Sequence, residues 1–150
     1  MKEPISRYFQ MGTLTWMSFP SLSTLEAVKR VAADEYFTAV EVRSCRDDAE
    51  REEVRRVLEQ AHLTVYYGAH PDLLSMKLNP NAVDEAERQR AETFLKHAVD
   101  EASYLGARGM AFLAGKWEEK GAGVQPAFKD HDPGLPLRGG KGTQGGAGAV

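Results

Sequence analysis

Segments of strand length alternate with segments of helix length along the first 117 residues, and this alternation constrains the fold more than any other feature. β-Branched and aromatic residues are concentrated in four short stretches, at 7–16, 38–44, 63–69 and 109–115. A helix-length segment separates each stretch from the next. Because a crossover of that length joins strands that run in the same direction, the order predicts a parallel sheet in an α/β fold.

Three helices are predicted to connect these strands. Ser23 and Glu26 form a capping box that starts the first helix, since the two side chains satisfy backbone amides that the helix leaves free. Acidic residues from Asp47 onward open the second helix, whose charged side chains are expected to face solvent. The third ends at Gly106, which suits a left-handed C-cap. Its continuous apolar stripe consists of Ala91, Phe94, Leu95, Ala98, Ala102 and Leu105.

Two architectures built on parallel strands compete for this pattern, the open doubly wound sheet and the closed eight-stranded barrel. A nucleotide-binding open sheet usually has a glycine-rich turn after its first strand, but the stretch TWMSFPSLST contains no glycine. A complete barrel needs eight strand–helix units in about 250 residues. The predicted fold is therefore a partial (βα)8 TIM barrel with about four parallel strands and three helices.

The composition changes sharply near Trp117. Nine of the 14 glycines lie beyond this residue, and the apolar spacing disappears there. We expect two regions: 1–117, the N-terminal half of a barrel, and 118–150, a glycine-rich disordered tail. Translation of a GC-rich coding sequence one base out of its reading frame gives an ending of this composition. Our hypothesis is therefore that the tail arose by a frameshift. The adjacent Asp130, His131 and Asp132 are expected to form a solvated turn rather than a metal site.

Charge and hydropathy disfavour several classes of partner. The chain has 19 basic and 22 acidic residues and a net charge of −3, which gives no broad positive field for nucleic acid or an anionic membrane.

No apolar run approaches the roughly 18 residues of a membrane span, and the N-terminus lacks a secretory pattern. Cys45 is the only cysteine, which favours a reducing compartment. We therefore expect a cytoplasmic protein.

The stretch NPNAVDEAERQRAETFLKHAVDEASYLGARGMAFLAGK, preceded by AVEVRS and HLTVYYGAHP, resembles the first half of the sugar phosphate isomerase/epimerase family. These proteins are xylose isomerase-like barrels, and the similarity covers about Met11 to Trp117. The resemblance implies a divalent metal held by carboxylates and a histidine from the later strands, and proton transfer between adjacent carbons of a sugar or polyol.

The implied metal ligands belong to strands five to eight, and no strand pattern follows Trp117. We therefore predict no metal ligand and no cofactor in this chain, and we expect this truncated copy to be inactive. The alternative is a non-catalytic half-barrel that acts in binding or assembly. A third hypothesis, nucleic-acid processing by a related endonuclease branch in which His70 would ligate zinc, is disfavoured by the acidic balance.

Residues at the carboxyl ends of the strands are candidates for binding a sugar-like substrate, because that end carries the active site of parallel barrels. His70 follows the third strand and either contacts a substrate or hydrogen-bonds the long loop from Pro71 to Pro80. Trp16 and Trp117 close the first and fourth strands, and they either form aromatic walls for a sugar or cap the barrel mouth. These residues do not make a recognisable catalytic group, so catalytic roles stay unassigned.

Glu41 is the fourth candidate for substrate binding. It lies within the second strand, where a carboxylate among apolar residues needs a partner or a role. Arg43 or Arg7 is the alternative partner if no substrate binds there.

A sheet of four barrel strands leaves two edges and one inner face uncovered. Exposed edges of this kind favour self-association. Either two copies close a barrel-like ring, or the chain aggregates.

Overall fold

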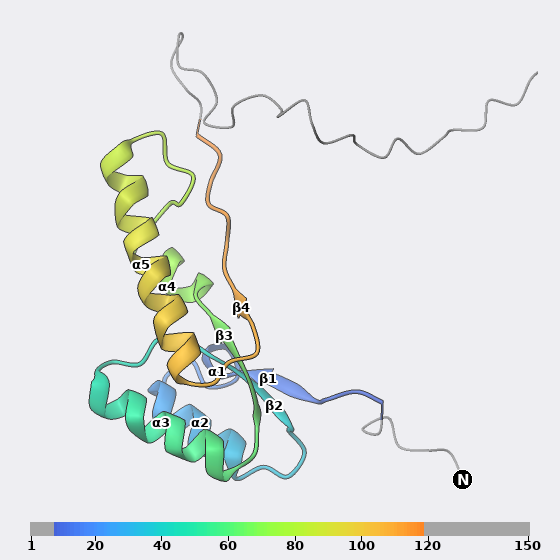
Figure 1. Ribbon diagram of the computed structural model, residues 1–150. Helices are drawn as coiled ribbons and strands as arrows, with labels where there is room; N and C mark the ends of the chain where they lie inside the picture. The colour runs from blue at the N-terminus through green and yellow to red at the C-terminus, as the bar shows by residue number, and fades with distance from the viewer. Residues whose placement is uncertain (1–7, 119–150) are drawn as a thin grey trace, which may run out of the picture. The chain divides into compact units, whose positions relative to one another are not determined.

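The computed structural model describes residues 8–118 and shows a mixed α/β fold (Figure 1). The strands are β1 (Gly12–Leu14), β2 (Ala39–Val42), β3 (Thr64–Gly68) and β4 (Met110–Ala111). The helices are α1 (Thr15–Ser18), α2 (Thr24–Ala32), α3 (Asp48–Gln60), α4 (His70–Ser75) and α5 (Glu85–Tyr104). Apart from Glu118, the predicted tail lies outside the described residues, as does Arg7.

The four strands form one parallel sheet in the order β1-β2-β3-β4. Leu14 is paired with Glu41, and Glu41 with Tyr66, so these three residues share a row across the sheet. A doubly wound sheet reverses its strand order near the first strand, whereas this order follows the chain without reversal. The predicted α/β fold with four parallel strands is confirmed.

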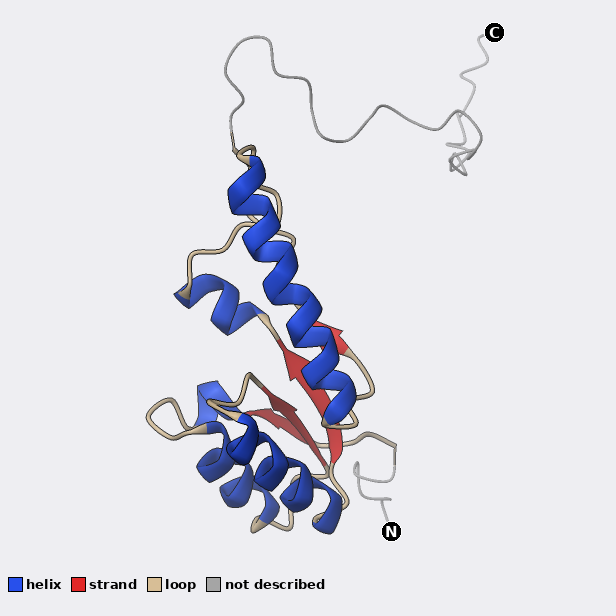
Figure 2. Cartoon of the chain, turned by 60° about the vertical axis from the view of Figure 1, so that its left-hand side comes forward, coloured by secondary structure: helices blue, strands red, loops and turns tan. Residues whose placement is uncertain are grey.

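The three long helices, α2, α3 and α5, pack against one face of the sheet. Figure 2, in which the helices come forward, shows the strands behind them. The buried residues of this core are Val28, Val31, Val40, Val42, Val54, Leu58, Val65, Tyr67, Ala69, Ala98, Ala102 and Leu105. Glu41 and Tyr66 alternate with the core residues along their strands and lie on the opposite face, where Tyr66 is 41% exposed.

The helix ends confirm the predicted capping signals. The Ser23 side chain accepts a hydrogen bond from the Glu26 amide, and the Glu26 carboxylate accepts one from the Ser23 amide. Asp47 caps α3 by accepting a hydrogen bond from the amide of Glu50. Gly106 follows α5 with a φ of 71°, the left-handed conformation expected at this position.

Three boundaries differ from the prediction. The first strand ends at Leu14, so Trp16 lies in α1 rather than at the end of a strand. The Thr15 hydroxyl donates a hydrogen bond to the Glu41 carbonyl oxygen at 3.2 Å, a tertiary contact that composition alone does not reveal. The fourth strand is limited to two residues, and α4 occupies part of the predicted long loop from Pro71 to Pro80.

Glu50 contradicts the expectation that the charged residues of α3 face solvent. It is 5% exposed, and its carboxylate accepts hydrogen bonds from the backbone amides of Leu25 at 3.2 Å and Arg46 at 2.7 Å. The first bond reaches the start of α2 and the second reaches the loop before α3. A single buried carboxylate therefore joins two adjacent βα units.

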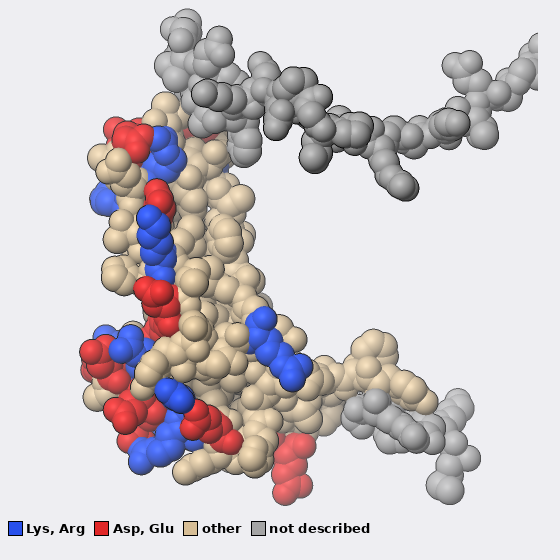
Figure 3. Space-filling model, in the orientation of Figure 1, with Lys and Arg blue, Asp and Glu red and all other residues tan. Residues whose placement is uncertain are grey.

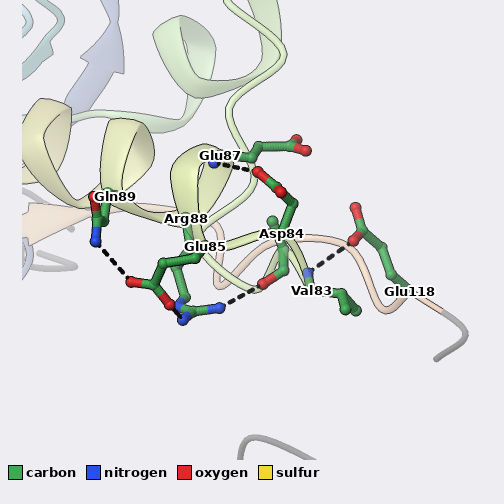
Figure 4. A network of polar contacts seen from close by, with 8 residues as sticks. Val83, Asp84, Glu85, Glu87, Arg88, Gln89 and Glu118 are labelled. Atoms are coloured by element: carbon green, nitrogen blue, oxygen red, sulfur yellow. Dashed lines mark hydrogen bonds and ion pairs between the residues drawn. The ribbon is translucent and has the colours of Figure 1, made fainter. Parts of the chain in front are cut away.

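Asn79 holds the segment that follows β4. Its side-chain oxygen accepts a hydrogen bond from the Lys116 amide at 2.8 Å, and its side-chain nitrogen donates to the Lys116 carbonyl at 3.2 Å. Glu118 adds a second tie, because its carboxylate accepts a hydrogen bond from the Asn79 side chain and another from the Val83 amide. Figure 4 shows the contact between Glu118 and Val83. We call these contacts the Asn79 clamp.

Replacing Glu50 with alanine should lower the free energy of unfolding by about 2 kcal/mol, since two buried amides would lose their acceptor. Urea unfolding followed by circular dichroism measures this change. Glu52→Ala is the matched control on an exposed position of the same helix, and we expect it to shift stability by less than about 0.5 kcal/mol. Equal effects of the two substitutions would contradict the buried tie.

Replacing Gly115 with alanine should release the Asn79 clamp. Gly115 has a φ of 104°, and an added Cβ would lie 2.2 Å from the Asn79 side-chain oxygen. We expect a loss of about 1 to 3 kcal/mol and faster hydrogen exchange of the Lys116 amide. The control is Gly106→Ala, which has a similar left-handed backbone but open space around the added Cβ. If both substitutions left the Lys116 amide equally protected, the clamp would be refuted.

Candidate functional site

Three of the four predicted site residues come together at the carboxyl ends of neighbouring strands. Trp16 lies in α1 directly after β1, Glu41 is in β2, and His70 begins α4 after β3. The rings of Trp16 and His70 meet edge to face with their centroids 5.1 Å apart. Gly68 lies between them and Glu41, and we call these four residues the strand-end cluster.

Gly68 makes the cluster sterically feasible. A Cβ at this position would lie 2.4 Å from the Trp16 ring and 2.5 Å from the Glu41 carboxylate, which is closer than real Cβ contacts. Gly68 is not among the predicted site residues, although a glycine inside a strand often marks a close approach of another group. The absent side chain lets the indole and the carboxylate reach the same place.

Glu41 is the member of the cluster whose pKa is shifted. Burial raises the pKa of its carboxyl group, while the nearby charge of His70 acts in the opposite, weaker sense. Its Oε1 atom is buried and has no hydrogen-bond partner among the described residues. Within residues 8–118 no ion pair joins it to Arg43, and Arg7 lies outside that range. Glu41 is therefore an available hydrogen-bond acceptor in a desolvated place.

The loop after β2 is fixed by carboxylates from three different helices. The Ser44 amide and hydroxyl donate to Asp72 of α4, at 3.4 and 2.9 Å. The Cys45 amide donates to Glu101 of α5 at 3.2 Å, and the Arg46 amide donates to Glu50 of α3 at 2.7 Å. Three successive amides thus each have a carboxylate partner. This arrangement holds the backbone that follows Glu41 and ties it to the helix that begins with His70.

Two groups beside this loop are unsuited to act as nucleophiles. Burial, followed by the nearby carboxylates of Glu101 and Glu50, raises the pKa of the Cys45 thiol well above its usual range. Burial and a 2.7 Å hydrogen bond to Glu101 raise the pKa of Tyr67 in the same way. Both groups stay protonated at neutral pH, so their role is to pack and to hydrogen-bond.

Trp117 does not join the cluster. It follows the Asn79 clamp residue Lys116 and is 77% exposed. Its predicted place at the end of the fourth strand is wrong, because β4 ends at Ala111 and an extended segment without regular structure follows. Figure 1 shows this segment, in orange, running on beyond β4.

The described residues do not fit the divalent metal that the family resemblance implies. Glu41 and His70 supply two donors of the right type, but Mg²⁺ and similar ions need several convergent ligands. Among residues 8–118, no group of three His, Cys, Asp or Glu side chains could hold a metal ion. The Asp130, His131 and Asp132 cluster lies outside this range. No chemical step is therefore assigned to a metal here.

A hollow separate from the strand-end cluster lies between α4 and the segment after β4, with a volume of about 360 Å³. Leu73, Leu78, Pro80 and Leu113 are among its mostly apolar lining residues. Hydrogen bonds from Val83 and Asn79 lower the pKa of Glu118 at its rim, which makes this carboxylate a weaker base. The carboxylates of the two places thus differ, since the pKa of Glu118 is lowered and that of Glu41 is raised.

Comparison with protein family models gives no match for this chain, and comparison with curated proteins gives none. No helix within residues 8–118 combines the length and hydrophobicity needed to cross a membrane. The interpretation of the strand-end cluster therefore depends on its geometry and on the chemistry of its side chains.

Glu41→Gln should stabilise the protein at neutral pH by about 1 kcal/mol, because it removes a charge from a desolvated place without a hydrogen-bond partner. Because the pKa of Glu41 is raised in the folded state, protonation favours folding as the pH falls. The stability gain should shrink below the folded pKa and disappear below the ordinary value of 4.5. Thermal unfolding between neutral and acidic pH measures it.

Glu52→Gln is the matched control for this pH series, since Glu52 is an exposed carboxylate on α3. It should leave the unfolding temperature nearly unchanged at every pH. A Glu41→Gln protein that is less stable than the wild type at neutral pH would show that the carboxylate has a stabilising partner.

Proposed function

We propose that the strand-end cluster binds a sugar or related polyol, as the substrate-binding part of a sugar phosphate isomerase/epimerase-like site. The observation that carries this proposal is the buried, unpaired Glu41 oxygen beside the Trp16 ring. An unpaired buried acceptor costs free energy, and a hydroxyl group from a ligand would satisfy it. The cluster is thus arranged as a polar contact beside an aromatic surface.

The chemistry of a polyol matches each part of this arrangement. Its hydroxyl groups can donate hydrogen bonds to the Glu41 carboxylate, and its C–H groups can pack against the Trp16 indole. The His70 ring, which meets the indole at 5.1 Å, offers nitrogen atoms that donate or accept. A small binding site commonly combines aromatic walls with a few convergent polar groups of this kind.

Glu41 also has the property needed of a base in isomerisation. Moving a proton between adjacent carbons requires a base whose pKa is closer to neutrality than that of an ordinary carboxylate. Burial shifts Glu41 in this direction. The reaction class suggested by the resemblance also uses a divalent metal, for which the described residues do not supply the ligands. We therefore expect the 150-residue chain to bind a polyol without turning it over.

Trp16 can report binding directly when Trp117 is replaced by phenylalanine, because the chain then has one tryptophan. Titration with D-xylose, D-fructose and their phosphates should change the Trp16 fluorescence and saturate. Glu41→Gln should weaken this binding about tenfold, the effect of losing one charged hydrogen-bond acceptor. Glu52→Gln, on an exposed part of α3, should leave it unchanged.

Solvent deuterium incorporation into the same sugars, followed by NMR with and without Mg²⁺ or Mn²⁺, tests for turnover. We expect none. Saturable binding that Glu41→Gln does not weaken would refute the role of the cluster, and the absence of saturation with every sugar would refute the proposed ligand class.

A further inference from the structure

The two outer strands of the sheet leave backbone hydrogen-bonding groups open. The amides of Tyr67 and Ala69 donate to the carbonyls of Gly109 and Ala111, at 3.0 and 2.8 Å. Because backbone groups point alternately to the two sides of a strand, those of Met110 and Phe112 point away from β3. β4 therefore presents an edge that no described strand covers.

β1 presents a similar edge on the other side of the sheet. The Ala39 amide donates to the Met11 carbonyl at 3.1 Å, so Met11 and, by alternation, Thr13 face β2. The backbone groups of Gly12 and the amide of Leu14 point outward, whereas the Leu14 carbonyl serves α1, of which Leu14 is the N-cap. In the strand order these two edges lie at opposite ends of the sheet and, because all pairs are parallel, they run in the same direction.

Large exposed apolar side chains gather next to these two edges. Seven residues before or after β1, after β4 or on the uncovered sheet face are between 41% and 77% exposed: Tyr8, Phe9, Met17, Tyr66, Phe112, Leu113 and Trp117. Charged side chains lie mainly along the helices, and much of the remaining surface in the same view is uncharged (Figure 3). Seven of the twelve large hydrophobic side chains that are exposed among the described residues therefore lie near the two sheet edges or on the uncovered face.

We propose that two copies of this chain associate through both edges to form a closed eight-stranded ring. A two-fold axis parallel to the strands keeps every strand direction. It places β4 of one copy beside β1 of the other, and it creates the second, identical junction by the same operation. Each junction is a parallel pair, like the pairs already present in the sheet. The helices then lie outside and no edge is left open.

The exposed apolar area is sufficient for such a dimer. If each large side chain has roughly 200 Å² of full area, the seven exposed residues offer about 800 Å² per chain. A stable protein interface buries about 800 Å² on each partner. A second copy is favoured over an unrelated extended peptide because it covers both edges at once.

Light scattering coupled to size-exclusion chromatography of the full chain tests this proposal. We expect twice the chain mass of 16.6 kDa at high concentration and dissociation on dilution. Phe112→Lys should weaken the dimer by roughly tenfold or more, because charge on an edge opposes strand pairing. Val99→Lys is the matched control: Val99 is 52% exposed on α5, as Phe112 is 50% exposed after β4.

Phe112→Pro provides a second test of the β4 edge. Its amide points to the open side, so proline removes no hydrogen bond within the chain and should leave the far-ultraviolet circular dichroism of the monomer unchanged. In the wild type, the amides of Met110 and Phe112 should exchange with solvent more slowly as the protein concentration rises. This last measurement needs no variant.

A wild-type chain that stays monomeric throughout the dilution series would overturn the proposal. So would a dimer that resists both Phe112 variants, a dimer that Val99→Lys disrupts equally, or concentration-independent exchange at Met110 and Phe112. Open-ended polymers would overturn ring closure, because they would show β4-to-β1 pairing that continues from copy to copy.

Discussion

The hydrogen bonds that fix the loop after β2 are the contacts on which the arrangement of the site depends. Ser44, Cys45 and Arg46 each donate an amide to a carboxylate from a different helix. These bonds are partly buried, so losing one leaves an unsatisfied polar group as well as a broken contact. Because they join α3, α4 and α5 to one loop, they align the helices with the strand that carries Glu41. The shared loop thus fixes the backbone next to the strand-end cluster.

Stability and the proposed binding make opposite demands at Glu41. The partly buried carboxylate, whose Oε1 atom has no partner among the described residues, opposes folding at neutral pH, as its raised pKa indicates. The β2 ladder, the Thr15 hydrogen bond and the loop carboxylates hold the backbone around Glu41 in place. Glu50 and Asp72 are buried too, but their oxygens have backbone or hydroxyl partners. The contrast separates carboxylates whose hydrogen bonds support the fold from one whose Oε1 atom has no partner among the described residues.

Local patterns in the sequence predicted what depends on neighbouring residues, and missed what depends on distant ones. The capping box at Ser23, the Asp47 cap and the left-handed Gly106 are local, and the structure contains all three. The strand-like composition of 7–16 did not reveal that α1 begins at Thr15, because the contact with Glu41 lies 26 residues away. The burial of Glu50 and the need for Gly68 arise from the same long-range packing. Three candidate site residues were found because parallel strands end at one rim, whereas Trp117 follows a strand that ends early.

The uniform direction of the strands explains both the site and the open edges. Each helix returns the chain to the same end of the sheet, so Trp16, Glu41 and His70 arrive at one rim although 54 residues of sequence separate the first from the last. The same repetition makes β1 and β4 run in one direction, so that one edge can pair in parallel with the other edge of a second copy. In a closed ring the carboxyl ends of all eight strands would point the same way. Two strand-end clusters would then share one rim.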